Sequence, residues 1–376
     1  MSELTTEQMT AANLRRYWLA TASSLILAAS IGSANSAVAA SGEDGRPTLW
    51  IELGSQLERV DGGQNLFMPP FSDSIVEAGF ESPAVAQTPP RYAFGGEVKL
   101  TLTPEGTDWV AFVAVRYGRS NGKKHMHEQR AVETQFMVLG NPFTATQQLA
   151  SDSKTQENES HEVLDFQAGK DVGLGLFGRG TFSVISGGIR FAEFTSKSKD
   201  DLIARPEYGF IPKVFFGIPF VTSTRYDYHG IAQNERSFRG IGPSLAWDAS
   251  LPVGGSEDGG FSFDWGINAA VLFGRQKSAG HHQTTAYHYT QKYGPQRRPR
   301  YVPAYTPKSA NHDRSRSVVV PNIGGFAGIS LRWSNAKVSL GYRGDFFFSA
   351  MDGGVDTRVS KDRDFYGPFA SIAVGL

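Results

Sequence analysis

The sequence predicts an all-β chain that forms a closed antiparallel up-and-down transmembrane β-barrel of about ten strands, with twelve as the alternative count. Three observations favour this fold: long stretches alternate between apolar and polar residues, short and long connections alternate along the chain, and the last residues form an amphipathic strand. Glycine, at 42 of 376 residues, exceeds its average share of about 7%. Such a composition is typical of strands and turns.

The first residues have the pattern of an export signal. Arg15-Arg16 precede an apolar run, and small residues ending at Ala39 follow it. The apolar run is shorter than the roughly 20 residues of a spanning helix, although an N-terminal transmembrane anchor and a twin-arginine signal stay open as alternatives. We therefore expect residues 1–39 to be a cleaved secretory signal peptide and residues 40–376 to form a single outer-membrane barrel domain.

The strands are predicted from a period of two. In residues 261–273, every odd position from Phe261 to Phe273 is apolar, and the even positions are mostly polar or small. Residues 338–350 repeat the pattern. Both runs are longer than a usual strand in a soluble protein and suit a tilted strand that crosses a bilayer. The ten predicted strands are residues 48–59, 91–103, 108–118, 163–176, 180–194, 237–251, 261–273, 317–333, 338–350 and 364–376.

The connections between these strands are alternately short and long. This alternation predicts tight periplasmic turns, long extracellular loops and both termini on the periplasmic side. Pairing of residues 201–211 with residues 211–228 would raise the count to twelve. The long loops are predicted at residues 60–90, 119–162, 195–236, 274–316 and 351–363.

The closing strand gives a partly separate indication of a barrel. Outward positions from Tyr366 to Leu376 alternate with small residues and phenylalanines, although the chain ends in leucine instead of phenylalanine. A soluble β-sandwich is the rival fold, because alternation alone does not tell a lipid-facing side from one that packs on a second sheet. The barrel prediction places the protein in the outer membrane of a Gram-negative bacterium.

Short motifs in the second half of the chain resemble a known family. They are Gly188-Ile189-Arg190-Phe191, Phe238-Arg239-Gly240-Ile241-Gly242-Pro243 and Leu272-Phe273-Gly274-Arg275. With the closing strand, they resemble a pore-forming outer-membrane family related to the Legionella major outer membrane protein. The resemblance implies a β-barrel porin or an outer-membrane protein of unassigned role. The absence of cysteine departs from the disulfide-linked Legionella protein.

If the apolar faces meet lipid, charged residues of both signs enter the lumen. A ten-stranded barrel is narrow, since eight strands are filled by their own side chains and open channels appear at about sixteen. Salt bridges that plug the lumen and a thin pore for ions or small solutes therefore stay open as alternatives. The lumen-facing candidates are Glu52, Glu97, Lys99, Arg116, Asp165, Arg190, Asp248, Asp264, Arg343 and Asp345.

The loop over residues 277–316 is strongly basic, with eight Lys and Arg residues against one Asp, and tyrosines lie between them. This pattern favours binding to lipopolysaccharide phosphates or another anionic envelope polymer; a solvated loop without a ligand is the alternative. The anion-binding candidates are Lys292, Arg297, Arg298, Arg300, Arg314 and Arg316.

Composition narrows the function. The 37 basic and 37 acidic residues balance, so we expect no nucleic-acid partner, and without cysteine there is no thiolate nucleophile. The eight histidines fall in predicted loops or at strand ends, so no metal, cofactor or catalytic residue is expected. The expected function is a porin-like channel or a structural envelope protein. Alternatives are a surface anchor that binds lipopolysaccharide, an envelope protein or a second copy, and, third, an outer-membrane hydrolase.

Overall fold

The computed structural model describes residues 49–61, 91–138, 140–173, 182–216, 218–256, 259–291, 300–305, 310–354 and 358–376. The predicted signal peptide and most of the predicted loop 60–90 lie outside these ranges. Within them, no helix has both the length and the apolarity needed to cross a membrane.

All regular elements in the described ranges are β-strands. They are β1 Leu49–Asp61, β2 Arg91–Leu102, β3 Trp109–Val138, β4 Asn141–Asp171, β5 Phe182–Phe215, β6 Ile218–Ser256, β7 Gly259–Gln291, β8 Arg300–Tyr305, β9 Ala310–Arg332, β10 Ala336–Asp352 and β11 Ser360–Gly375.

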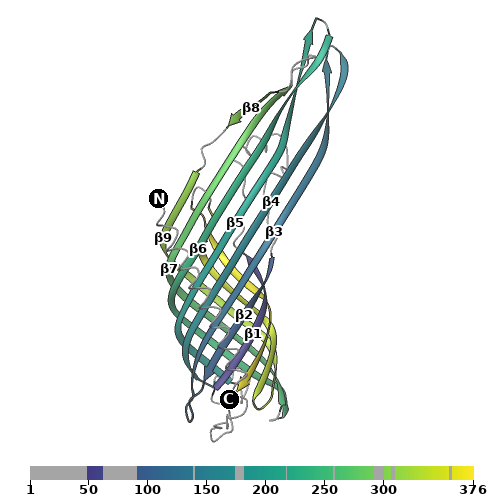
Figure 1. Cartoon of the computed structure of the whole chain (residues 1–376). Coiled ribbons are helices and arrows are strands. Elements are labelled where there is room, and N and C mark those ends of the chain that lie inside the picture. The colour runs from purple at the N-terminus through teal and green to yellow at the C-terminus, as the bar shows by residue number, and fades with distance from the viewer. Residues whose placement is uncertain are drawn as a thin grey trace, which may run out of the picture.

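Ten of these strands close into a ring. Each pairs antiparallel with the next in the order β1–β2–β3–β4–β5–β6–β7–β9–β10–β11, and β11 pairs with β1. The short strand β8 lies outside the ring and, among the described residues, pairs with the far end of β7. The predicted closed antiparallel barrel of ten strands is confirmed (Figure 1).

The strands are much longer than predicted on one side of the barrel. β3 and β4 pair without a break from Trp109↔Lys170 to Val138↔Asn141, and β5 and β6 pair as far as Phe215↔Ile218. Residues 119–162 and 195–236, predicted as loops, are therefore mostly strand, and so is much of 274–316. The pairing of residues 207–215 with 218–226 continues β5 and β6, so the alternative count of twelve is wrong.

This extension has a physical reason. In residues 151–161 of β4, the buried face carries Ser151, Ser153, Thr155 and Glu157 instead of apolar residues, so hydrophobic alternation is absent. Continuous antiparallel backbone pairing holds these strands together, and it leaves no periodic signal in hydropathy. A pair of strands with polar residues on both faces is therefore predicted as a loop from its hydropathy.

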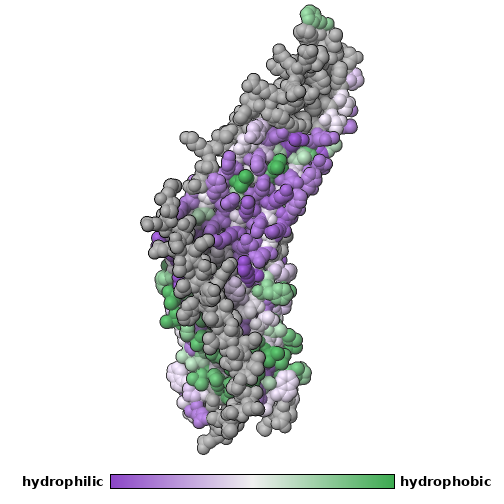
Figure 2. Space-filling view, viewed as in Figure 1, coloured by the Kyte–Doolittle hydropathy of each residue, from purple (hydrophilic) through white to green (hydrophobic). Residues whose placement is uncertain are grey.

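The long strands form a one-sided wall. β3 to β7 have 30 to 39 residues each, whereas β1, β2, β10 and β11 have 12 to 17. We call residues 118–138, 141–162, 193–215, 218–239 and 274–291 the wall. It rises from the ring at the end opposite the short turns (Figure 1), and hydrophilic residues cover much of its visible described surface (Figure 2).

Below the wall, the outer surface of the ring is apolar on every strand, which we call the belt. Hydrophobic residues gather there in Figure 2. One outward residue from each ring strand, each between 37% and 78% exposed, shows the pattern: Leu53, Phe94, Val115, Phe166, Ile189, Ile241, Ile267, Ile323, Leu340 and Ile372.

Candidate functional site

The interior of the ring holds a buried ionic cluster at the level of the belt. Arg190 is 2% exposed, and its guanidinium donates two hydrogen bonds to Asp165, at 2.7 and 2.9 Å. It also donates to the side-chain oxygens of Asn268, at 2.7 Å, and Asn322. Arg190 and Asn322 lie on strands three places apart in the ring, so this cluster reaches across the interior and not merely along one sheet face.

Two more arginines extend this cluster across the ring. Arg116 of β3 forms an ion pair with Asp345 of β10, four places away, and lies 3.8 Å from an oxygen of Asp165. Arg343 forms an ion pair with Glu97, three places away. Because charges removed from water need partners, these pairs compensate each other in an interior where an isolated ion would be costly.

The remaining predicted lumen residues lie nearer the turn end. Asp264 is paired with Lys337 at 2.6 Å. Glu52 and Lys99 are direct neighbours in the register of β1 and β2. The Asp248 carboxylate is close enough to Lys99 and Lys337 to be attracted electrostatically by both ammonium groups. The structure thus places all ten predicted residues on the inward faces of their strands, in contact with or close to groups of opposite charge.

A layer of four phenylalanines lies above the ionic cluster, toward the wall. The Phe194 ring lies 4.7 Å from Phe347, 5.3 Å from Phe365 and 5.6 Å from Phe238, measured between centroids. All four are 4% exposed or less. β5 and β11, which carry Phe194 and Phe365, are five places apart in the ring in either direction. The opposite sides of the ring are therefore in contact through these aromatic side chains.

A second ionic level follows above the phenylalanines. Arg363, 0% exposed, donates hydrogen bonds of 3.1 and 2.8 Å to the two carboxylate oxygens of Glu159, four places across the ring. His161 lies 3.2 Å from the Glu58 carboxylate. A Cβ atom at Gly118 would collide with the His161 ring, so a glycine is needed there for this close approach.

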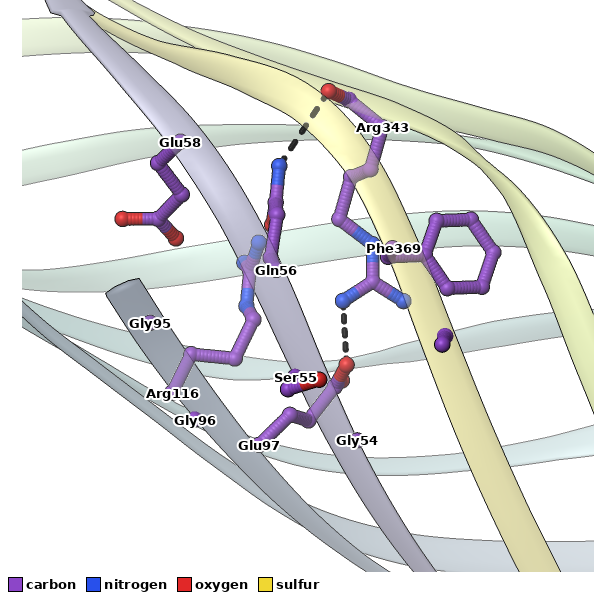
Figure 3. A pocket seen from close by; sticks show the side chains of 11 residues that line it. Gly54, Ser55, Gln56, Glu58, Gly95, Gly96, Glu97, Arg116, Arg343 and Phe369 are labelled. Atoms are coloured by element: carbon purple, nitrogen blue, oxygen red, sulfur yellow. Dashed lines mark hydrogen bonds and ion pairs between the residues drawn. The ribbon is translucent and has the colours of Figure 1, made fainter. Parts of the chain in front are cut away.

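One small cavity lies within the ionic cluster (Figure 3). Its volume is about 10 Å³, which is room for roughly one water molecule. The Arg343 guanidinium lies 5.0 Å from the Phe369 ring centroid and points toward Glu97 in this view. The cavity is lined by Gly54, Ser55, Gln56, Glu58, Gly95, Gly96, Glu97, Arg116, Arg343, Phe369 and Ala370.

The predicted anion-binding residues of the basic loop are only partly described. Lys292, Arg297 and Arg298 lie outside the described residues, and of Arg300 the structure describes the backbone, in β8. The guanidinium of Arg314 already has protein partners: it pairs with Asp352 at 3.0 Å and donates to the carbonyl oxygen of Gly354 at 2.9 Å. Arg316 is exposed.

Sequence reasoning missed several interior residues. Arg363 lies two positions before Phe365 and so on the same inward face; extension of the predicted closing strand by one position would have found it. Lys337 was missed because it precedes the predicted start of its strand. Glu159 and His161 were missed because their segment was predicted as a loop.

A buried carboxyl group in the wall titrates unusually. Burial raises the pKa of Asp200 to about 6, although the Thr155 hydroxyl and the Arg236 guanidinium lower it. Burial likewise lowers the pKa of Arg236 to about 10. Since unfolded Asp titrates near 3.9, ionisation of Asp200 opposes folding once the pH rises through about 4 to 6.

We therefore expect Asp200→Asn to stabilise the protein at pH 7.5 and to have little effect near pH 4. The amide cannot ionise, so the variant loses only the penalty that the wild type acquires as pH rises. The difference between wild-type and variant thermal midpoints, followed by circular dichroism at several pH values, tests this. A difference that is independent of pH, or a less stable variant at pH 7.5, contradicts it.

No protein-family model matches the chain, and no curated protein matches it. Among solved structures, it is similar to the transport unit of the autotransporter AIDA-I from Escherichia coli, with 7% identity over 89% of this chain and 92% of that chain and a TM-score of 0.22. It is also similar to the toluene transporter TodX of P. putida, with 10% identity over 88% of this chain and 90% of that chain and a TM-score of 0.19. Similarity this low carries no argument about function, and the resemblance to the Legionella-related family stays a prediction.

Proposed function

We propose that this chain is a Gram-negative outer-membrane β-barrel with a closed lumen, which anchors the wall at the cell surface. The belt supports the membrane placement. On β7 it runs over residues 261–273, about 40 Å along the strand and about 28 Å across a bilayer at a tilt of roughly 45°. That height matches a hydrocarbon core of about 30 Å, and the ring buries its backbone polar groups in a sheet without edges.

The observation that carries the closed lumen is the contact between Phe194 and Phe365 across the full ring. Ionic groups close the interior on both sides of this contact, through Arg190 with Asp165 below it and Arg363 with Glu159 above it. Opening a path would separate buried ion pairs and expose aromatic rings to water, and both changes are unfavourable. The ring is thus better suited to a structural anchor than to a porin-like channel.

Conductance in planar bilayers tests this proposal. We expect no discrete conductance steps from the wild type, while a porin reconstituted in the same membranes gives them. Insertion is checked separately by flotation with lipid vesicles and by different gel migration before and after boiling. Regular steps at low voltage from inserted protein would contradict the closed lumen and favour a channel for ions or small solutes. Failure to float with lipid would contradict the membrane placement itself.

A further inference from the structure

The first residues above the belt form a row of outward side chains in which charges are segregated. Strand register places them side by side on six consecutively paired strands, β3, β4, β5, β6, β7 and β9: Tyr117, Glu162, Glu193, Arg239, Arg275 and Ser317. The acidic part lies on β4 and β5, and the basic part on β6 and β7. Lys277, two residues above Arg275 on the same face of β7, adds a third positive charge.

The basic part is exposed and only weakly neutralised. The Arg239 side chain is 65% exposed and lies 3.8 Å from Glu193, a distance at the limit of an ion pair. Arg275 donates a hydrogen bond of 2.6 Å to the Ser315 hydroxyl, which carries no charge. Over the row and Lys277, three basic groups (Arg239, Arg275 and Lys277) stand against two acidic ones (Glu162 and Glu193), which leaves a net charge of about +1 with the positive charges gathered on β6 and β7.

Arg239 and Arg275 are direct cross-strand partners. Like charges in this position destabilise a sheet, so an anion held between the two guanidinium groups would relieve the repulsion. Arginine suits this role, because its planar fork binds phosphate oxygens in pairs.

Apolar residues lie directly below the basic group. Ile241, Phe273 and Val319 are neighbours in register on β6, β7 and β9, and each is 54% to 56% exposed. The Arg239 guanidinium lies 5.2 Å from the Phe191 ring centroid. The surface thus offers an apolar face for acyl chains and, immediately above it, cations for a headgroup.

We propose that Arg239, Arg275 and Lys277 form a binding site for the phosphate groups of lipopolysaccharide in the outer leaflet. The site rests on the proposed membrane placement, because only that placement brings these side chains to the headgroup level. It lies on paired strands beside the belt. Arg275 and Lys277 belong to the first residues of the segment predicted as the loop 274–316, but none of the three site residues is among the six predicted anion-binding candidates.

The test compares R239S/R275S/K277S with the matched control K154S/K197S/K199S. The control removes three basic residues from outward positions higher on the wall, where no belt residues lie beneath them. Both variants and the wild type are reconstituted in phosphatidylcholine nanodiscs and titrated with bisphosphorylated lipid A, dephosphorylated lipid A or inorganic phosphate. Bound lipid is measured by native mass spectrometry.

We expect the wild type and the control variant to bind bisphosphorylated lipid A with similar affinity. The site variant should bind at least roughly tenfold more weakly, as expected for lost hydrogen bonds between charged groups. Equal binding by the site variant, an equal loss in the control, or equal binding of dephosphorylated lipid A would each overturn the proposal. Inorganic phosphate that competes at the same concentration as lipid A would overturn the lipid as the ligand.

Failure of this proposal is distinguishable from failure of the membrane placement. Vesicle flotation and heat-dependent gel migration report insertion of each variant without reference to lipid A. Inserted variants that bind lipid A like the wild type would overturn the phosphate site and leave the closed barrel untouched. A wild type that does not insert would overturn the placement and the phosphate site together.

Discussion

Arg190→Ala is expected to lower the free energy of unfolding by about 3–5 kcal/mol, the usual cost of breaking a buried ion pair by removal of one partner. Arg190 holds Asp165 with two hydrogen bonds and also binds the side chains of Asn268 and Asn322. In the variant, the 5% exposed Asp165 carboxylate loses its nearest cation. Equilibrium unfolding by urea in lipid vesicles measures the effect.

A second variant separates the charge from the general loss of packing. Arg190→Leu combined with Asp165→Leu removes both charges and fills part of the space, so we expect it to be more stable than Arg190→Ala alone. A change of less than about 1 kcal/mol for Arg190→Ala would show that the interior is hydrated well enough to solvate Asp165, which contradicts the filled lumen.

Phe194→Ala is expected to cost about 3–5 kcal/mol of stability, as for other large aromatic side chains removed from a core. Phe194 contacts three other rings of the layer, and it is the residue through which β5 reaches the opposite strand. Its loss leaves a cavity at the centre of the phenylalanine layer. The unfolding midpoint in vesicles gives the change.

The matched control for this variant is Phe216→Ala. Phe216 is 89% exposed at the tip between β5 and β6, so we expect a change within about 0.5 kcal/mol. If Phe194→Ala were as stable as Phe216→Ala, the opposite sides of the ring would not be in contact in the folded protein.

Much of the ring could be predicted from the sequence. In residues 261–273 the two faces differ strongly in hydropathy, because one faces away from the interior and the other carries polar or small residues. The inward parity of Arg190 and Asp345 followed from the same alternation. Period two is a local property, so a single strand is enough to show it.

The partners of these residues could not be predicted in the same way. Arg116 and Asp345 are 229 positions apart, and they meet because ring closure and register bring β3 opposite β10. Likewise, nothing local indicates that Phe194 contacts Phe365. The wall was missed for another reason: where both faces of a strand are polar, hydropathy no longer differs between them.

The proposed anion site likewise depends on strand register, which local sequence patterns do not reveal. The dense basic loop is visible in the sequence as a cluster of charges, whereas Arg239 and Arg275 stand 36 positions apart, and nothing local indicates that their charges lie together. Their significance comes from register, which makes them neighbours at the edge of the belt.

The most direct test of the account is a scan of single cysteines along β7, each carrying a spin label, in the reconstituted protein. The chain contains no cysteine, so every label is unique. Over residues 261–273, odd positions should be accessible to oxygen dissolved in lipid and even positions should not. From residue 275 upward, odd positions should instead be accessible to a water-soluble nickel complex. Odd positions that are shielded from both reagents would contradict the account, because their side chains would then be packed inside protein.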